Sequence, residues 1–306
     1  MLLVIDGTNL AHRAYYALRN SRNGVPVTSS RLPIACCSAA LPSILNMIRL
    51  YRPTHVAIAF DGHEKTFRHE LYPLYKAGRK EKEAMLIDDL SIFQTLLVNL
   101  GIGIVAPSRY EADDLIATLI NQWEGSAIVY SGDRDLFQLA DDQTSILFPS
   151  PKHKSTILLA PADIQEMMGV HACQIGDLKA LEGDTSDNIP GVRGIGATMA
   201  VKLLSQYDSV EHIYHHVHQN SGTMPALTRL KAGEADALSS KALVKLVNNV
   251  PVPEDVFAKF DLARIGNLEL FRFESRLRQL GLSEIALNFY EGLPERLCQE
   301  GSLFNF

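Results

Sequence analysis

The chain is poor in cysteine, and the spacing of its cysteines excludes the common cysteine-based sites. Its 306 residues contain only four: Cys36, Cys37, Cys173 and Cys298. They form no C-x-x-C pair and no zinc-binding spacing, and the adjacent Cys36 and Cys37 are typical of small core residues. The pattern argues against a disulfide framework or a zinc finger and favours a reducing compartment.

Long apolar runs are also missing. No run reaches the roughly 20 residues that cross a bilayer, so we expect no membrane segment. No basic region with an apolar core behind it follows Met1, so we expect no secretory signal. With 46% hydrophobic and 21% charged residues, the composition is that of a soluble globular protein, and we expect it in the cytoplasm.

The chain lacks an excess of positive charge as well. Its formal net charge is −6, which at first argues against a nucleic-acid partner, because such proteins usually have a basic surface. The basic residues are nevertheless bunched in two stretches, residues 65–82 and residues 152–154. Local distribution decides phosphate binding more than the total charge does. A solvated charged face is the alternative explanation of these stretches.

Apolar runs of strand length alternate with helical patterns over the first half of the chain. The strands are predicted at residues 2–5, 56–60, 102–105, 127–130, 145–148 and 156–159. Alternation of this kind predicts an α/β fold with a mostly parallel central sheet flanked by helices. From about residue 161 onward the pattern is helical, and we place a domain boundary near residue 168.

Acidic side chains recur where the predicted strands end. Asp6 and Asp61 directly follow two strands, residues 131–135 follow a third, and residues 110–114 open a helix with three carboxylates. In an open α/β sheet the carboxyl ends of the strands form one ligand-binding edge, so these groups are expected to converge. Convergence of so many carboxylates requires a counter-charge, which divalent cations bound by oxygen ligands supply.

Nine carboxylates make up the predicted metal site, which is expected to hold two Mg²⁺ or Mn²⁺ ions for phosphodiester hydrolysis. One ion is assigned to Asp6, Asp61, Glu111 and Asp113, the other to Asp133, Asp135, Asp184 and Asp187, and Asp114 bridges them or acts through water. Each acid taken alone is equally well explained as a helix cap or a turn residue. Five acidic segments at corresponding strand ends favour the metal site.

A glycine-rich segment, Gly191-Val192-Arg193-Gly194-Ile195-Gly196, precedes a predicted helix at residues 197–207. Glycines before a helix let backbone amides approach a phosphate, with the helix N-terminus behind them. A dinucleotide-binding fold would need a strand before the glycines and an acid about 20 residues later. A predicted helix at residues 172–181 precedes them instead, which favours a helix–hairpin–helix that binds the DNA backbone.

Aromatic and basic residues are interleaved in a further stretch, residues 67–80. Phe67-Arg68 and Tyr75-Lys76-Ala77-Gly78-Arg79 combine cations able to neutralise a phosphate with rings able to stack on a base. A solvated loop explains the same composition equally well.

Together these motifs resemble those of the 5′ nuclease (flap endonuclease) family, and in particular the N-terminal 5′–3′ exonuclease domain of bacterial DNA polymerase I. The resemblance runs over residues 1–290 and implies a PIN-like core at residues 1–168, with a helical arch at about residues 75–100. It also implies a helical duplex-DNA-binding region at residues 169–290 and a tail at residues 291–306. The matching segments are Val4-Ile5-Asp6-Gly7, Phe60-Asp61, Phe67-Arg68-His69-Glu70, Tyr75-Lys76-Ala77-Gly78-Arg79, Tyr110-Glu111-Ala112-Asp113-Asp114, Gly132-Asp133-Arg134-Asp135-Leu136, Gly183-Asp184-Thr185-Ser186-Asp187-Asn188 and the glycine-rich segment.

The resemblance implies structure-specific hydrolysis of DNA at 5′ flaps, nicks and ends, in replication and repair. It assigns Lys76 and Arg79 as electrostatic catalysts at the base of the arch, and Arg68, Tyr75 and the glycine hairpin as DNA contacts, with a K⁺ ion at the hairpin. We also expect a monomer at the nucleoid with a separate DNA polymerase as partner. Residues 35–38 depart from the Gly-Phe pair usual in relatives, which leaves the DNA grip of that helix open.

Two alternatives remain at this stage. One is a DNA-binding structural protein that keeps the fold without cutting, although the presence of all nine acids together with Lys76 and Arg79 argues against it. The other is a related RNA nuclease with a similar acidic core, against which the glycine hairpin argues only by analogy with the family.

Overall fold

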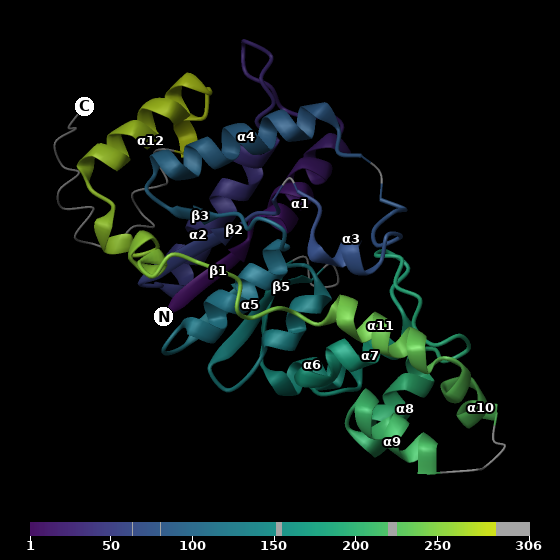
Figure 1. Ribbon diagram of the computed structural model, residues 1–306. Coiled ribbons are helices and arrows are strands. Elements are labelled where there is room, and N and C mark those ends of the chain that lie inside the picture. The colour runs from purple at the N-terminus through teal and green to yellow at the C-terminus, as the bar shows by residue number, and fades with distance from the viewer. Residues whose placement is uncertain (63, 80, 151–154, 220–224, 286–306) are drawn as a thin grey trace.

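A single six-stranded sheet forms the centre of the protein. The computed structural model describes residues 1–62, 64–79, 81–150, 155–219 and 225–285 (Figure 1), so the predicted tail lies outside the described residues. The strand order is β3-β2-β1-β4-β5-β6, and neighbours are parallel except for the antiparallel pair β5 and β6. The predicted α/β fold with a mostly parallel sheet is therefore confirmed. The strands are β1 (Leu2–Asp6), β2 (His55–Ala59), β3 (Gly103–Val105), β4 (Ala127–Tyr130), β5 (Thr144–Ser150) and β6 (Ser155–Leu159).

Helices cover both faces of this sheet because its central strands are apolar on both sides. In β1, Leu3 and Ile5 belong to one hydrophobic core, and Leu2 and Val4 belong to the other. Successive side chains of a strand alternate between the two faces. A parallel strand covered on both faces therefore reads as a continuous apolar run, which is the pattern that predicted β1.

The helices divide between these two cores. The core that contains Leu3 also contains side chains of α1 (Gly7–Arg19), the π-helix η1 (Cys36–Ala40), α2 (Leu41–Tyr51), α4 (Ala84–Asn99), the 3₁₀ helix η5 (Leu262–Arg264) and α12 (Asn267–Gln279). The core that contains Leu2 includes α5 (Ala112–Gln122), α6 (Pro161–Met168), α7 (Ile175–Glu182), α8 (Ala197–Tyr207), α9 (Val210–Gln219), α10 (Pro225–Ala232), α11 (Glu234–Val244) and the 3₁₀ helices η2 (Arg134–Leu139), η3 (Ala172–Gln174) and η4 (Val256–Lys259). The short α3 (Phe67–Leu71) lies between α2 and α4 in the chain. No helix within the described ranges is long and apolar enough to cross a membrane.

The C-terminal half of the chain occupies two separate places. Helices α8 to α10 lie together at the end of the molecule opposite α12 (Figure 1). After them the chain returns to the sheet, where the backbone N–H of Val56 donates to the carbonyl of Phe260 at 2.8 Å. Helix α12 then packs beside α4, with Phe273 and Leu277 in the core. Residues 256–280, which belong to the predicted DNA-binding region at residues 169–290, are thus physically part of the α/β core.

Replacing Phe273 with alanine tests this return. The side chain is fully buried, so Phe273→Ala is expected to lower the free energy of unfolding by about 3–5 kcal/mol. Phe271, two residues earlier on the same helix, is 55% exposed, and Phe271→Ala should change the free energy by less than about 0.5 kcal/mol. Urea denaturation of both variants provides the measurement. Equal effects would contradict the packing of α12 into the core.

Candidate metal and nucleic-acid site

Carboxylates gather at one edge of the sheet because parallel strands end there together. Asp6 ends β1 opposite Ala59 of β2, and Asp61 follows two residues later in the chain. On the other side of β1, β4 ends at Tyr130, and Asp133 then caps η2 with its side chain. This is the carboxyl edge of the sheet, where ligands bind in open α/β folds.

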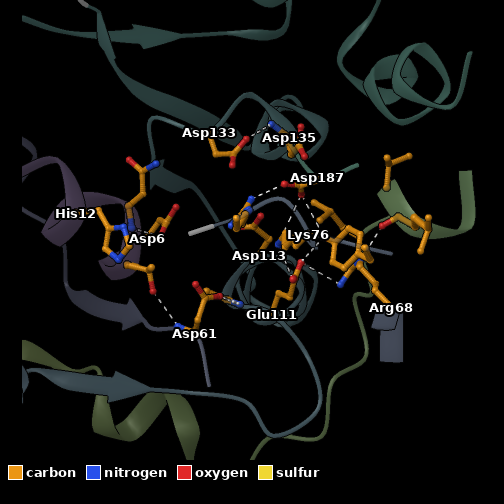
Figure 2. Close-up of a pocket in the computed structure, with 18 of the residues that line it drawn as sticks. Asp6, His12, Asp61, Arg68, Lys76, Glu111, Asp113, Asp133, Asp135 and Asp187 are labelled. Carbon is orange, nitrogen blue, oxygen red and sulfur yellow. Dashed lines mark hydrogen bonds and ion pairs between the residues drawn. The ribbon is translucent and has the colours of Figure 1, made fainter. Parts of the chain in front are cut away.

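A cleft of about 270 Å³ opens at this edge, and Figure 2 shows acidic side chains directed into it from several elements. Lys76, Arg79 and Tyr75 line the same cleft. Asp114 and Asp184 lie outside its lining. The other seven of the nine predicted ligands line it: Asp6, Asp61, Glu111, Asp113, Asp133, Asp135 and Asp187.

The electrostatics of the cleft are those of an acid cluster without sufficient counter-charge. Burial raises the pKa of Asp6 to about 7, and the charges of Asp61 and Asp133 add to this, although the Asn9 N–H and the Ser131 hydroxyl oppose it. Burial also raises the pKa of Asp113 well above its usual range, followed by the charges of Asp6 and Asp133. Asp133, which the sequence assigns to the second ion, therefore raises the pKa of Asp6 and Asp113, which are assigned to the first. A bound cation would relieve this repulsion.

The donor set fits a hard divalent cation. It consists of carboxylate oxygens, which Mg²⁺ and Mn²⁺ prefer. Among the residues that the structure describes, no three acidic, histidine or cysteine side chains are arranged to hold an ion directly. Mg²⁺ commonly keeps several of its waters and contacts only one or two carboxylates, so a wider arrangement of acids is compatible with it.

The two predicted catalytic cations contact predicted ligands. The Lys76 ammonium lies 2.5 Å from Glu111 Oε1 and 3.6 Å from Asp187 Oδ2, and the Arg79 guanidinium pairs with Asp187. The Tyr75 hydroxyl donates to Glu111 Oε2 at 3.0 Å. The backbone N–H of Lys76 also donates to the Asp187 carbonyl at 2.9 Å, which fixes the lysine over the cleft in a left-handed conformation with φ of 55°.

A third cation, Lys179 of α7, contacts two further predicted ligands, Asp135 and Asp184. Its ammonium lies 2.7 Å from Asp184 Oδ2 and also pairs with Asp135 Oδ1. Burial opposes the charge of Lys179, but the Asp135 and Asp184 carboxylates outweigh it and raise the pKa of the ammonium. Asp184 is thus joined to the cleft through Lys179 and Asp135.

Arg68, which lines the cleft, forms a buried ion pair with Asp114, which lies outside the lining. Arg68 is 2% exposed, and its Nη1 and Nη2 donate to the two Asp114 carboxylate oxygens at 2.5 and 2.7 Å. Asp114 also accepts from the backbone N–H of Glu111 at 3.1 Å, which completes a capping box at the start of α5. The sequence predicts that Asp114 bridges the metal ions or acts through water, and that Arg68 contacts DNA. In the structure both side chains are buried and contact Glu111, which favours a supporting role for them, and the Glu111-x-x-Asp114 spacing of a capping box was the available signal.

The glycine hairpin, residues 191–196, has both buried and solvent-exposed residues. Val192 and Ile195 are buried, whereas Arg193, Gly194 and Gly196 are exposed. Gly191 has φ of 59°, and a Cβ there would lie 2.2 Å from the backbone nitrogen of Gly183, so only glycine fits. The exposed backbone of the hairpin and the Arg193 side chain remain available to a ligand.

Helix α1 supplies cleft residues that the sequence patterns did not identify. Thr8, Asn9, His12 and Arg13 line the cleft, and Figure 2 shows His12 beside Asp6. His12 Nε2 is buried without a hydrogen-bond partner in the part of the chain that the structure describes. Positions 8 and 9 and positions 12 and 13 are one helical turn apart, so they share the face that follows Asp6. This spacing was the available signal.

The raised pKa values predict how pH affects the metal-free protein. Between about pH 4 and pH 7 folded Asp6 keeps a proton that the unfolded chain has released, so the free energy of unfolding falls as the pH rises. Asp6→Asn removes this contribution, which is on the order of 4 kcal/mol. The difference between wild type and variant in urea denaturation across this range measures it.

At pH 8, saturating Mg²⁺ should raise the melting temperature of the wild type by roughly 5–10 °C. A wild type insensitive to both pH and Mg²⁺ would contradict the cluster.

Both halves of the chain match one family. Residues 1–169 match the family described as 5′-3′ exonuclease, N-terminal resolvase-like domain, and residues 170–264 match 5′-3′ exonuclease, C-terminal SAM fold. DNA polymerase I of Synechocystis sp. is 39% identical over 262 residues, which cover 83% of this chain and 26% of that protein. DNA polymerase I of Bacillus subtilis is 35% identical over 83% of this chain and 29% of its own length. The chain thus spans about a quarter to a third of these relatives.

Solved structures share the fold at lower identity. T5 5′-exonuclease with bound zinc is 23% identical, with a TM-score of 0.65 over 91% of this chain and 98% of that one. The catalytic core of Rad2 in complex with a DNA substrate is 14% identical, with a TM-score of 0.58 over 99% of this chain and 91% of that one. With its fold, its acidic cleft and both matched regions, the chain belongs to the 5′-3′ exonuclease family.

Proposed function

We propose that this protein is a structure-specific 5′ nuclease that hydrolyses DNA phosphodiester bonds at 5′ flaps, nicks and ends. One observation carries the proposal: seven carboxylates and the cations Lys76 and Arg79 line a single cleft at the carboxyl edge of the sheet. An acid cluster beside two cations suits metal-assisted attack on a phosphodiester rather than simple DNA binding. Membership of the 5′-3′ exonuclease family supports the same reaction.

Two divalent cations, Mg²⁺ or Mn²⁺, would be held by these carboxylates. When bound, they would polarise the scissile phosphate and lower the pKa of water. The charge of Asp133 raises the pKa of both Asp6 and Asp113, so these three acids are the best candidates for one ion, with Asp61 and Glu111 beside them. The T5 and Rad2 structures, with metal and with DNA, support both ligands by similarity of fold.

Lys76 and Arg79 would bind the phosphate that enters the cleft. They now pair with Glu111 and Asp187. A cation that neutralises these ligands would release both side chains towards substrate oxygens, where fixed positive charge stabilises the developing negative charge. Tyr75 is 4% exposed and donates its hydroxyl to Glu111, so it positions this carboxylate.

The glycine hairpin would hold the duplex at a distance from the cleft. Its exposed face consists of Arg193 and the backbone of Gly194 and Gly196, in front of the N-terminus of α8. Backbone groups of this kind contact phosphates without reading sequence, and a K⁺ ion bound by carbonyls there would strengthen the contact.

We further propose a monomer that works on DNA at the nucleoid in the cytoplasm. We also propose a DNA polymerase as a functional partner, because extension of the opposing 3′ end displaces the strand that forms a 5′ flap.

The experiment uses a 5′-labelled flap on a nicked duplex with Mg²⁺ or EDTA, and a matched single-stranded RNA alongside. Metal-dependent release of the flap near its junction is expected. Asp113→Asn should lower kcat at least about 100-fold, since it removes a cleft carboxylate, while flap binding persists. Asp142→Asn, an exposed acid outside the cleft, serves as the matched control and should retain full activity.

Other outcomes would identify other functions. Flap binding without cleavage in Mg²⁺ or Mn²⁺ would indicate a DNA-binding protein that keeps the fold without the reaction. Cleavage of RNA alone would indicate an RNA nuclease and would remove the proposed role of the hairpin. Unchanged activity in Asp113→Asn would move the reaction away from this cleft.

A further inference from the structure

Lys179 occupies the space between two predicted metal ligands. It lies on α7, its ammonium is 2.7 Å from Asp184 Oδ2, and it pairs with Asp135 Oδ1 of η2. All three side chains are mostly buried, with 14 to 17% of each exposed. The lysine thus joins an acid in the cleft to one outside its lining.

Both carboxylate oxygens of Asp184 already accept hydrogen bonds. Its Oδ1 accepts from the Ser186 N–H at 2.8 Å and from the Ser186 hydroxyl at 2.7 Å. Its Oδ2 accepts from Lys179. The serine bonds are local and hold the turn after α7, so the lysine is the partner that an incoming cation would have to replace.

The carboxylates on the other side of the cleft, Asp6, Asp113 and Asp133, are not paired in this way with a cation that the structure describes. No Lys or Arg within the described ranges forms an ion pair with Asp6, Asp113 or Asp133. Hydrogen bonds from the Asn9 N–H and the Ser131 hydroxyl are the contacts of Asp6. A cation therefore meets uncompensated carboxylates on this side and an ammonium already in place on the other.

We propose that Lys179 is a tethered counter-ion that competes with the second divalent cation for Asp135 and Asp184. This inference rests on the proposed metal-dependent function. It predicts two unequal ion sites, because the second cation binds only as it displaces the ammonium from both carboxylates. A DNA phosphate in the cleft adds negative charge and shifts this competition towards the cation, so substrate and second ion favour each other's binding.

The test measures Mn²⁺ binding without any reaction. The full-length protein is titrated with Mn²⁺, and free Mn²⁺ is counted by electron paramagnetic resonance. Wild type should bind one ion tightly and a second more weakly. Lys179→Met removes the charge and keeps the length of the side chain, so it should tighten the second ion at least about tenfold. Lys179→Arg keeps the charge and should leave the second ion weak.

A second lysine in the same region provides a matched control. Lys241 of α11 also bridges two carboxylates, at 2.6 Å from Asp177 Oδ1 and 2.5 Å from Glu211 Oε2, but none of these lines the cleft. Lys241→Met should leave both Mn²⁺ affinities unchanged. Thermal unfolding adds an independent readout: Lys179→Met should lower the melting temperature without metal and gain more than wild type from Mn²⁺, because its acids are uncompensated.

The outcomes separate this inference from the proposed function. A second-ion affinity within twofold of wild type in Lys179→Met would overturn the competition. Loss of the second ion in that variant would also overturn it, since the lysine would then organise the ligands. Equal tightening in Lys179→Arg would show that charge is not the cause. If wild type binds no Mn²⁺ at all, the proposed function itself fails.

Discussion

Mutual repulsion of carboxylates at one sheet edge is the constraint on which the rest of the site depends. The parallel order of β2, β1 and β4 brings Asp6, Asp61 and Asp133 together whether or not their charges suit one another. Lys76, Arg79 and Lys179 form ion pairs with some of the acids that line the cleft. The other acids there have no positively charged partner among the described residues. The uneven distribution of these cations gives the cleft its character as a cation site.

A second, buried ion pair ties the helical half of the chain to this edge. Arg68 donates to Asp114 and also to the carbonyls of Leu243 and Lys245 at 2.7 and 3.1 Å. The backbone N–H of Val247 donates to Asp114 at 2.9 Å, so the segment after α11 is held against α5. Such a pair adds little net stability over apolar packing, but removal of one partner leaves a buried charge. It fixes the position of Glu111 more than it stabilises the fold.

The sequence predicted what is local and repetitive. Apolar runs located the strands, and acids that follow them located the cleft, because strand ends in a parallel sheet are neighbours by geometry. The buried role of Arg68 and the return of α12 to the core depend on contacts across more than a hundred residues, which no periodicity records. The pairing of Lys179 with Asp135 joins two elements that lie closer in the chain, but no periodicity records it either. Helical spacing places His12 on the same face as Thr8 and Asn9, so its position in the cleft could have been predicted. A single polar residue on an amphipathic helix is, however, a weak indication of a functional site.

The central claim is that this cleft holds two divalent cations, and anomalous diffraction from crystals soaked in Mn²⁺ tests it most directly. The account predicts one strong peak among Asp6, Asp113 and Asp133, and a weaker one between Asp135 and Asp184 with the Lys179 ammonium displaced. Peaks only at the protein surface, with every cleft carboxylate keeping its present partners, would contradict it.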